Sequence, residues 1–131
     1  MTKQARAQAT EATVTIRLTA NGKTFTGTLE DTPAASDLLA MLPLSLTFED
    51  LAGEEKWARL PNSLDVSGAP EGADGQAGGI YHYVPWQNLA LFYGDHGFAD
   101  GLVKLGRLDD DAVAFLASAP QHLDLTIQAA D

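Results

Sequence analysis

The chain has 131 residues, 45% of them hydrophobic and 20% charged, which suffices for one domain with a hydrophobic core and without a metal or disulfides. Eighteen Asp and Glu residues against eight Lys and Arg give a formal net charge of −10, which disfavours nucleic acid and anionic membranes as partners. Cysteine is absent, which excludes disulfides, thiol catalysis and cysteine-ligated metals.

The first twelve residues contain no apolar run, so we expect a flexible N-terminal tail there and not a secretory signal. No segment approaches the ~20 consecutive apolar residues that a membrane-spanning helix needs. We therefore expect a cytoplasmic protein whose single domain covers residues 13–131.

A β-hairpin and a helix are the first predicted elements. Residues 14–20 and 25–29 alternate apolar or small residues with polar ones, mostly threonine, as half-buried strands do. Asn21-Gly22 lies between them and is typical of a type I′ turn, whose two central residues need positive φ. Thr32, as N-cap, and Pro33 then predict the start of a short helix over residues 34–41.

The middle of the chain combines two strands with a long segment rich in glycine. Alternation predicts strands over residues 44–48 and 56–60, separated by a turn around Gly53. Residues 62–79 then form the longest irregular segment. Loops beyond ~12–15 residues are usually functional or mobile, so we expect this segment to border a functional groove.

The second half of the chain predicts four more strands and a helix. Residues 80–84 and 89–93 are strands joined by a tight connection, and a loop over residues 94–101 leads to a strand over 102–108. Gly106 inside that strand indicates a bulge or a bend. Three aspartates at residues 109–111 open a helix, because carboxylates stabilise the positive end of the helix dipole. Residues 123–127 alternate as the last strand.

The predicted architecture is mainly β. Eight strands and two short helices in a chain of this length indicate a closed barrel, because closure leaves no edge strand and helices can cover the open ends. An open sheet with helices is the alternative, and it would leave two edges that this sequence does little to protect.

Two stretches carry a resemblance to a known family. One reads LPLSLTFED at residues 42–50 and is followed by Glu55-Lys56 and Leu60-Pro61. The other reads GGIYHYVPWQNLALFY at residues 78–93 and continues as GLVKLGRL at residues 101–108. Together they resemble a bacterial family of small cyclophilin-like proteins, which implies a cyclophilin-like, closed eight-stranded antiparallel β-barrel with two short α-helices. Relatives often have glycine where this chain has Gln87.

That family is largely of unknown function, so the resemblance implies architecture more than activity. True cyclophilins are prolyl isomerases that polarise the proline carbonyl with an arginine, and their F-H-R and Q-G-G-D-F runs do not occur here. A divergent isomerase remains an alternative. It would use Arg59 as the polarising group and Trp57, Tyr83 or Phe92 as the proline pocket.

Aromatic residues gather in the predicted strands that surround the long loop, where they either line an apolar groove or form the core and rim of the barrel. His96 beside Asp95 is a candidate acid–base pair, but neighbouring loop residues need not point together, and an exposed loop histidine is the favoured interpretation. The three histidines are too widely spaced in sequence to predict a metal site, and no cofactor is expected. The candidate ligand-binding residues are Trp57, Arg59, Tyr81, Tyr83, Trp86, Phe92 and His96.

No nucleophile motif or phosphate-binding loop is present, so catalysis has no signature in this sequence. We expect a binding module that holds a small molecule or an extended peptide in a groove beside residues 62–79. The alternatives are the divergent isomerase and a structural subunit that forms a homo-oligomer through an exposed face. Neither nucleic acid nor a membrane is expected as a partner.

Overall fold

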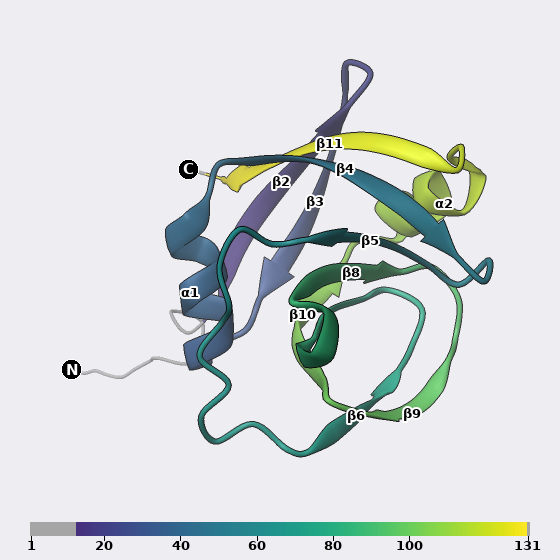
Figure 1. The fold of residues 1–131 in the computed structure, drawn as a ribbon. Helices are drawn as coiled ribbons and strands as arrows, with labels where there is room; N and C mark the ends of the chain where they lie inside the picture. The colour runs from purple at the N-terminus through teal and green to yellow at the C-terminus, as the bar shows by residue number, and fades with distance from the viewer. Residues whose placement is uncertain (1–12, 131) are drawn as a thin grey trace.

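The computed structural model describes residues 13–130 and confirms the closed barrel (Figure 1). Eight strands pair antiparallel in the order β10-β3-β2-β11-β4-β5-β8-β7, and pairing of β7 with β10 closes the ring. Their bounds are β2 (Val14–Ala20), β3 (Lys23–Leu29), β4 (Leu44–Leu51), β5 (Glu55–Arg59), β7 (Gly79–Tyr83), β8 (Asn88–Phe92), β10 (Leu102–Leu108) and β11 (His122–Ala129). The tail predicted over residues 1–12 lies outside the described residues.

Two helices, α1 (Pro33–Met41) and α2 (Asp110–Ser118), lie near opposite ends of β4 (Figure 1). The predicted start of α1 is confirmed, because the Thr32 hydroxyl accepts a hydrogen bond from the Ala35 amide at 3.2 Å. Asp109 occupies the N-cap of α2, but its carboxylate accepts the Thr26 hydroxyl and does not cap the helix. With nine residues each, neither helix of the described chain is long enough to cross a membrane.

The lumen of the barrel is filled by the inward-facing half of each strand. Buried residues of α1 and α2 join the same core, so the helices complete the packing that the barrel walls begin. Its largest fully buried members include Phe48, Leu29, Leu38, Ile80, Leu89, Leu91, Leu105 and Ile127.

Two local predictions are confirmed by the backbone. Asn21 and Gly22 have φ of 52° and 77°, as the predicted hairpin turn requires. The pairing of β10 with β7 shifts register between Lys104 and Gly106, which is the predicted bulge. A Cβ at Gly106 would lie 2.0 Å from the carbonyl oxygen of Thr28, so only glycine fits there.

The two segments predicted as loops each contain a strand, which corrects the sequence prediction. β6 (Gly72–Gly75) and β9 (Gly97–Asp100) pair as a two-stranded ribbon outside the barrel. Alternation could not reveal β6, because two of its four residues are glycines that carry no side chain. Both glycines are needed sterically: a Cβ at Gly72 would lie 2.4 Å from the oxygen of Ala99, and one at Gly75 would lie 2.9 Å from the Phe92 ring.

The ribbon covers a second, smaller core on the outer face of the barrel. Four buried residues of β7, β8 and β10 form this core, and Ala73 and Ala99 of the ribbon pack against it with Trp57 and Tyr83. The four are Tyr81, Ala90, Phe92 and Leu102. Strands β7 and β8 are therefore buried on both faces, which accounts for their near-continuous apolar sequence.

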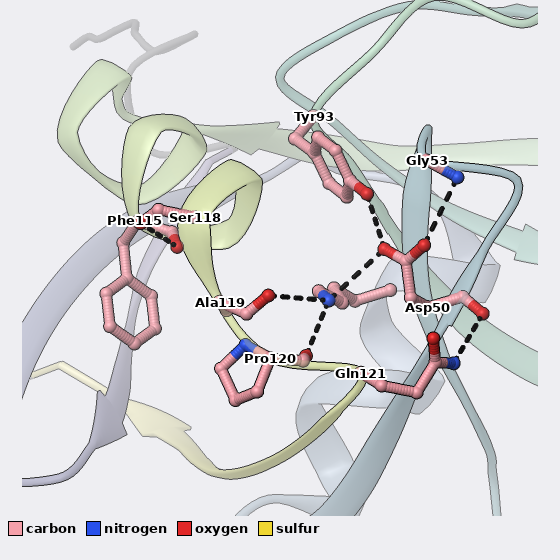
Figure 2. A network of polar contacts seen from close by, with 9 residues as sticks. Asp50, Gly53, Tyr93, Phe115, Ser118, Ala119, Pro120 and Gln121 are labelled. Carbon is pink, nitrogen blue, oxygen red and sulfur yellow. Dashed lines mark hydrogen bonds and ion pairs between the residues drawn. The ribbon is translucent and has the colours of Figure 1, made fainter.

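A buried lysine, Lys56, is bound to the segment that follows α2, whose residues Ala119 and Pro120 are labelled in Figure 2. Lys56 is 1% exposed, and its ammonium donates to the carbonyl oxygens of Pro120 at 2.8 Å and Ala119 at 3.3 Å. It also pairs with the carboxylate of Asp50 at 3.2 Å. Three oxygens thus surround this charge, as burial of an ammonium requires.

The partner carboxylate is held just as closely. The Tyr93 hydroxyl donates to one oxygen of Asp50, and the Gly53 amide donates to the other at 3.1 Å (Figure 2). Burial alone would raise the pKa of Asp50, but the hydrogen bonds from Tyr93, Lys56 and Gly53 together lower it below its usual value. This network ties the turn after β4 to the segment that follows α2.

Candidate functional site

A pocket of about 210 Å³ opens on the outer face of the barrel, beside the second core. We call it the outer aromatic pocket. Its walls come from the end of β4, from β5, β7, β8 and β10, from the ribbon strand β9, and from two connections. The lining residues are Leu51, Glu55, Tyr83, Trp86, Phe92, His96, Ala99 and Leu102. Four of the seven candidate residues from the sequence, Tyr83, Trp86, Phe92 and His96, therefore meet in one place.

The connection between β7 and β8 positions two of the rings. A 3₁₀ turn, η2 (Val84–Trp86), carries Trp86 over the pocket, and the buried side chain of Asn88 accepts the Tyr83 amide at 2.8 Å. The Trp86 ring lies 5.0 Å from that of Trp57 and 5.7 Å from that of Tyr83, measured between centroids. Trp57 therefore supports Trp86 from behind and is not itself part of the lining.

Gln87 ends this turn with φ of 48°, in the left-handed region that favours glycine. Its side-chain amide donates to the carbonyl oxygen of Leu60 at 2.8 Å, and the Leu60 amide donates back to the Gln87 carbonyl oxygen at 2.8 Å. These two bonds fasten the turn to the end of β5 and offset the backbone strain.

Tyr81 is a structural anchor and does not line the pocket. Its buried hydroxyl donates to the carbonyl oxygen of Asp74 at 2.9 Å and accepts the Gln76 amide at 3.1 Å. Burial raises the pKa of this phenol. Its ring forms an edge-to-face contact with that of Phe92, with the centroids 4.8 Å apart. Tyr81 therefore connects the ribbon to the strand of the barrel that carries Phe92.

His96 does not pair with Asp95, so the candidate acid–base pair is not formed, and the side chain is 46% exposed. The Asp95 carboxylate accepts the Ala77 amide at 2.9 Å, whereas Nδ1 of His96 lies 2.9 Å from a carboxylate oxygen of Glu54. Within residues 13–130, no three Asp, Glu or His side chains gather as ligands of a metal ion.

Glu55 is a pocket residue that the sequence reasoning missed. Its side chain lies in the wall of the pocket with 8% exposure, and no donor among residues 13–130 forms a hydrogen bond with its carboxylate. Burial raises its pKa from 4.5 to about 7; His96 lowers the pKa, and Glu54 and Asp50 raise it further. Alternation was the signal available, since Glu55 lies two residues before Trp57 and shares its face of β5.

Arg59 is exposed near the other end of β5 and does not line the pocket. The group that the isomerase alternative needs beside the aromatic rings is therefore absent from this lining, and an acidic residue stands there instead. The groove expected beside residues 62–79 is also a separate place. Several of those residues line a different cavity of about 260 Å³ near the start of α1, and none of them borders the outer aromatic pocket.

Comparison with known proteins bears on this geometry. The model of the Cyclophilin-like family matches residues 18–128, a span that contains the whole lining of the pocket. The chain belongs to the Cyclophilin-like family. The cyclophilin-like part of the resemblance seen in the sequence is thereby confirmed, and the outer aromatic pocket lies within the matched residues.

A solved structure is similar to this Cyclophilin-like chain in fold. It is the solution structure of a hypothetical protein from Archaeoglobus fulgidus, with a TM-score of 0.65 at 12% identity, covering 91% of this chain and 96% of that one. Likeness at this identity shows the fold alone. No curated protein matches the chain. The function of this domain therefore has to be argued from the pocket itself.

Proposed function

We propose that the chain is a binding module whose outer aromatic pocket holds a small molecule or one side chain of an extended peptide. The observation that carries this proposal is the character of the lining. Apolar and aromatic side chains form most of it, and only Glu55 and His96 bring charge-bearing groups to it. Sites for small ligands typically combine an apolar wall with a few polar groups that orient the ligand.

The size of the pocket limits what it holds. Its volume of about 210 Å³ lies below the ~300–1,000 Å³ typical of sites for drug-sized molecules. A small molecule or a single side chain matches that volume, whereas a large cofactor does not.

The surroundings of the pocket also favour a binding role. The exposed large hydrophobic residues among those described are Leu51, Val84, Trp86 and Phe98. Leu51 and Trp86 line the pocket. Exposed apolar residues at one concavity mark interaction sites more often than scattered ones do. The rest of an extended peptide would contact these two side chains.

Tryptophan fluorescence tests the proposal directly. The two tryptophans of the chain, Trp57 and Trp86, are in contact beside the pocket, so the whole tryptophan signal reports on this region. Small metabolites and capped tripeptides that vary the central residue would be titrated into the intact protein. We expect at least one ligand to change the emission with saturation.

A matched pair of variants separates pocket binding from surface adsorption. Ala99→Leu places a larger side chain in the lining, whereas Ala114→Leu adds the same group on the exposed face of α2. Binding should be lost in the first variant and kept in the second. Equal binding by both variants would contradict the proposal, and so would the absence of saturation with every compound. A homodimer, detected by light scattering, in which Trp86 is buried would contradict it as well.

A further inference from the structure

The carboxylate of Glu55 sets the electrostatic character of the outer aromatic pocket. The residue is 8% exposed, its side chain lines the open pocket, and no residue of the described chain donates a hydrogen bond to the carboxylate. A buried carboxylate without a partner is unfavourable, and a cation in contact with it removes that cost. The pocket therefore contains one half of an ion pair.

The charged neighbours of Glu55 do not supply the other half. Glu54 and Asp50, from the turn and the strand that precede β5, add negative charge beside it. His96, from the connection after β8, attracts the Glu55 carboxylate electrostatically but forms its ion pair with Glu54, through Nδ1 at 2.9 Å. The two cations of β5 lie elsewhere: Lys56 is bound inside the barrel, and Arg59 is exposed four residues further along the strand.

Aromatic rings complete the arrangement around this carboxylate. Phe92 pairs directly across from Glu55 in the β5–β8 register, and Tyr83 and Trp86 form an edge-to-face pair with centroids 5.7 Å apart. The faces of such rings attract cations, most strongly where water is excluded, and aromatic cages are a recurring way of holding alkylammonium groups. The net charge of −10 also attracts cations toward the protein.

We propose that the outer aromatic pocket recognises an organic cation, whose ammonium group pairs with Glu55 and packs against the rings of Tyr83, Trp86 and Phe92. This inference rests on the proposed binding function and names the chemistry of its ligand. The ammonium group belongs either to a small amine or to a lysine side chain of an extended peptide, and the pocket volume of about 210 Å³ admits both.

The test compares a cation with its uncharged isostere. Choline and 3,3-dimethylbutan-1-ol have the same shape and differ in charge. Each would be titrated into the intact protein at pH 8 with tryptophan fluorescence as the readout. We expect choline to bind at least about tenfold more tightly, the ratio that a desolvated cation–π contact with a carboxylate nearby supports. A capped pentapeptide containing lysine, against the same peptide with norleucine, distinguishes the peptide source from the small amine.

Two variants connect the preference to Glu55. Glu55→Gln keeps the shape of the side chain and should bring choline and its isostere to equal affinity. Glu30→Gln removes the same charge from an exposed position outside this pocket and should keep the preference. If Glu55→Gln fails to fold, the pH dependence of the wild-type protein replaces it. Affinity for choline should then rise about tenfold from pH 6 to pH 8 as Glu55 ionises, while affinity for the isostere stays constant.

The possible results separate this inference from the function it rests on. If the isostere binds as tightly as choline, the ligand does not need a positive charge, and the inference of a cation is wrong. The proposed function as an apolar binding module is then unaffected. An undiminished preference in Glu55→Gln would overturn the role of Glu55. If neither choline nor the lysine peptide binds, the inference fails, and the wider ligand titration decides the binding function separately.

Discussion

The side chains of Glu55 and Lys56, adjacent in sequence and opposite in charge, lie on opposite sides of one barrel wall. Lys56 points into the barrel and meets three oxygens, whereas Glu55 faces the outer aromatic pocket and meets no donor among the described residues. Successive side chains of a strand point to opposite faces, so the two charges cannot neutralise each other. The ammonium of Lys56 therefore binds oxygens inside the barrel, and the carboxylate of Glu55 remains available to a ligand in the pocket.

The raised pKa of Glu55 predicts a specific pH dependence of stability. The folded protein holds this proton up to about pH 7 and the unfolded chain only to about 4.5, so the folded state binds more protons between these values. Ionisation of Glu55 therefore destabilises the fold as pH rises from 4.5 to 7.

Urea denaturation of Glu55→Gln and wild type across this range measures the effect. The variant should match the wild type near pH 4.5 and become more stable than it by pH 8. Glu30→Gln, which removes an exposed carboxylate, should show no comparable change. A difference between Glu55→Gln and wild type that is independent of pH would contradict the burial of an unpaired carboxylate.

Replacement of Lys56 should be among the most destabilising single changes. Lys56→Met leaves Asp50 without its ion-pair partner and leaves the oxygens of Ala119 and Pro120 without their donor. The loss of these contacts costs about 1–3 kcal/mol, because Asp50 is partly exposed and keeps its hydrogen bonds from Tyr93 and Gly53. Urea denaturation would measure the loss against Lys23→Met, an exposed lysine of the β2–β3 hairpin that should change stability little.

A double-mutant cycle separates the Lys56–Asp50 pair from the rest of the network. The double variant Asp50→Asn with Lys56→Met should be less destabilised than the sum of the two single variants, because neither then leaves the other charge unpaired. Strict additivity would mean that the two side chains do not interact in the folded protein.

Tyr81→Phe should loosen the ribbon without unfolding the barrel. The change removes the hydrogen bonds from the hydroxyl to Asp74 and Gln76 and costs about 1–2 kcal/mol. Hydrogen exchange should speed up at the amides of residues 72–76 more than in β2 or β11. Tyr83→Phe is the matched control, because the hydroxyl of Tyr83 has no partner among the described residues. Uniform loss of protection over the whole barrel would contradict a local role.

Two substitutions of Gln87 separate backbone strain from its side-chain hydrogen bond. Gln87→Ala keeps the left-handed backbone and loses the bond to Leu60, so it should be destabilising by about 1 kcal/mol. Gln87→Gly loses the same bond but relieves the strain, so it should be more stable than the alanine variant by about 1 kcal/mol. Thermal unfolding ranks the three proteins. An alanine variant at least as stable as the glycine variant would contradict the strain.

Local sequence signals predicted the barrel because each acts over a few residues. These signals depend on local φ angles and on the side-chain period of a strand. They are the threonine alternation in β2 and β3, the Asn21-Gly22 turn, the Thr32 cap and the Gly106 bulge. The same signals failed for β6, whose glycines have no side chain to alternate and whose partner strand β9 lies far along the chain.

The candidate site was likewise predicted in part from local sequence and decided in part by tertiary packing. The sequence by itself determined that aromatic rings crowd the strands from β5 to β8, and hence that a ring-lined site was plausible near them. Only the tertiary structure decided which rings share a pocket, that Arg59 stays outside it, and that Glu55 lies in its wall. The physical reason is that a pocket forms where separate strands and a ribbon converge, and the burial that shifts the pKa of Glu55 exists only once they have packed.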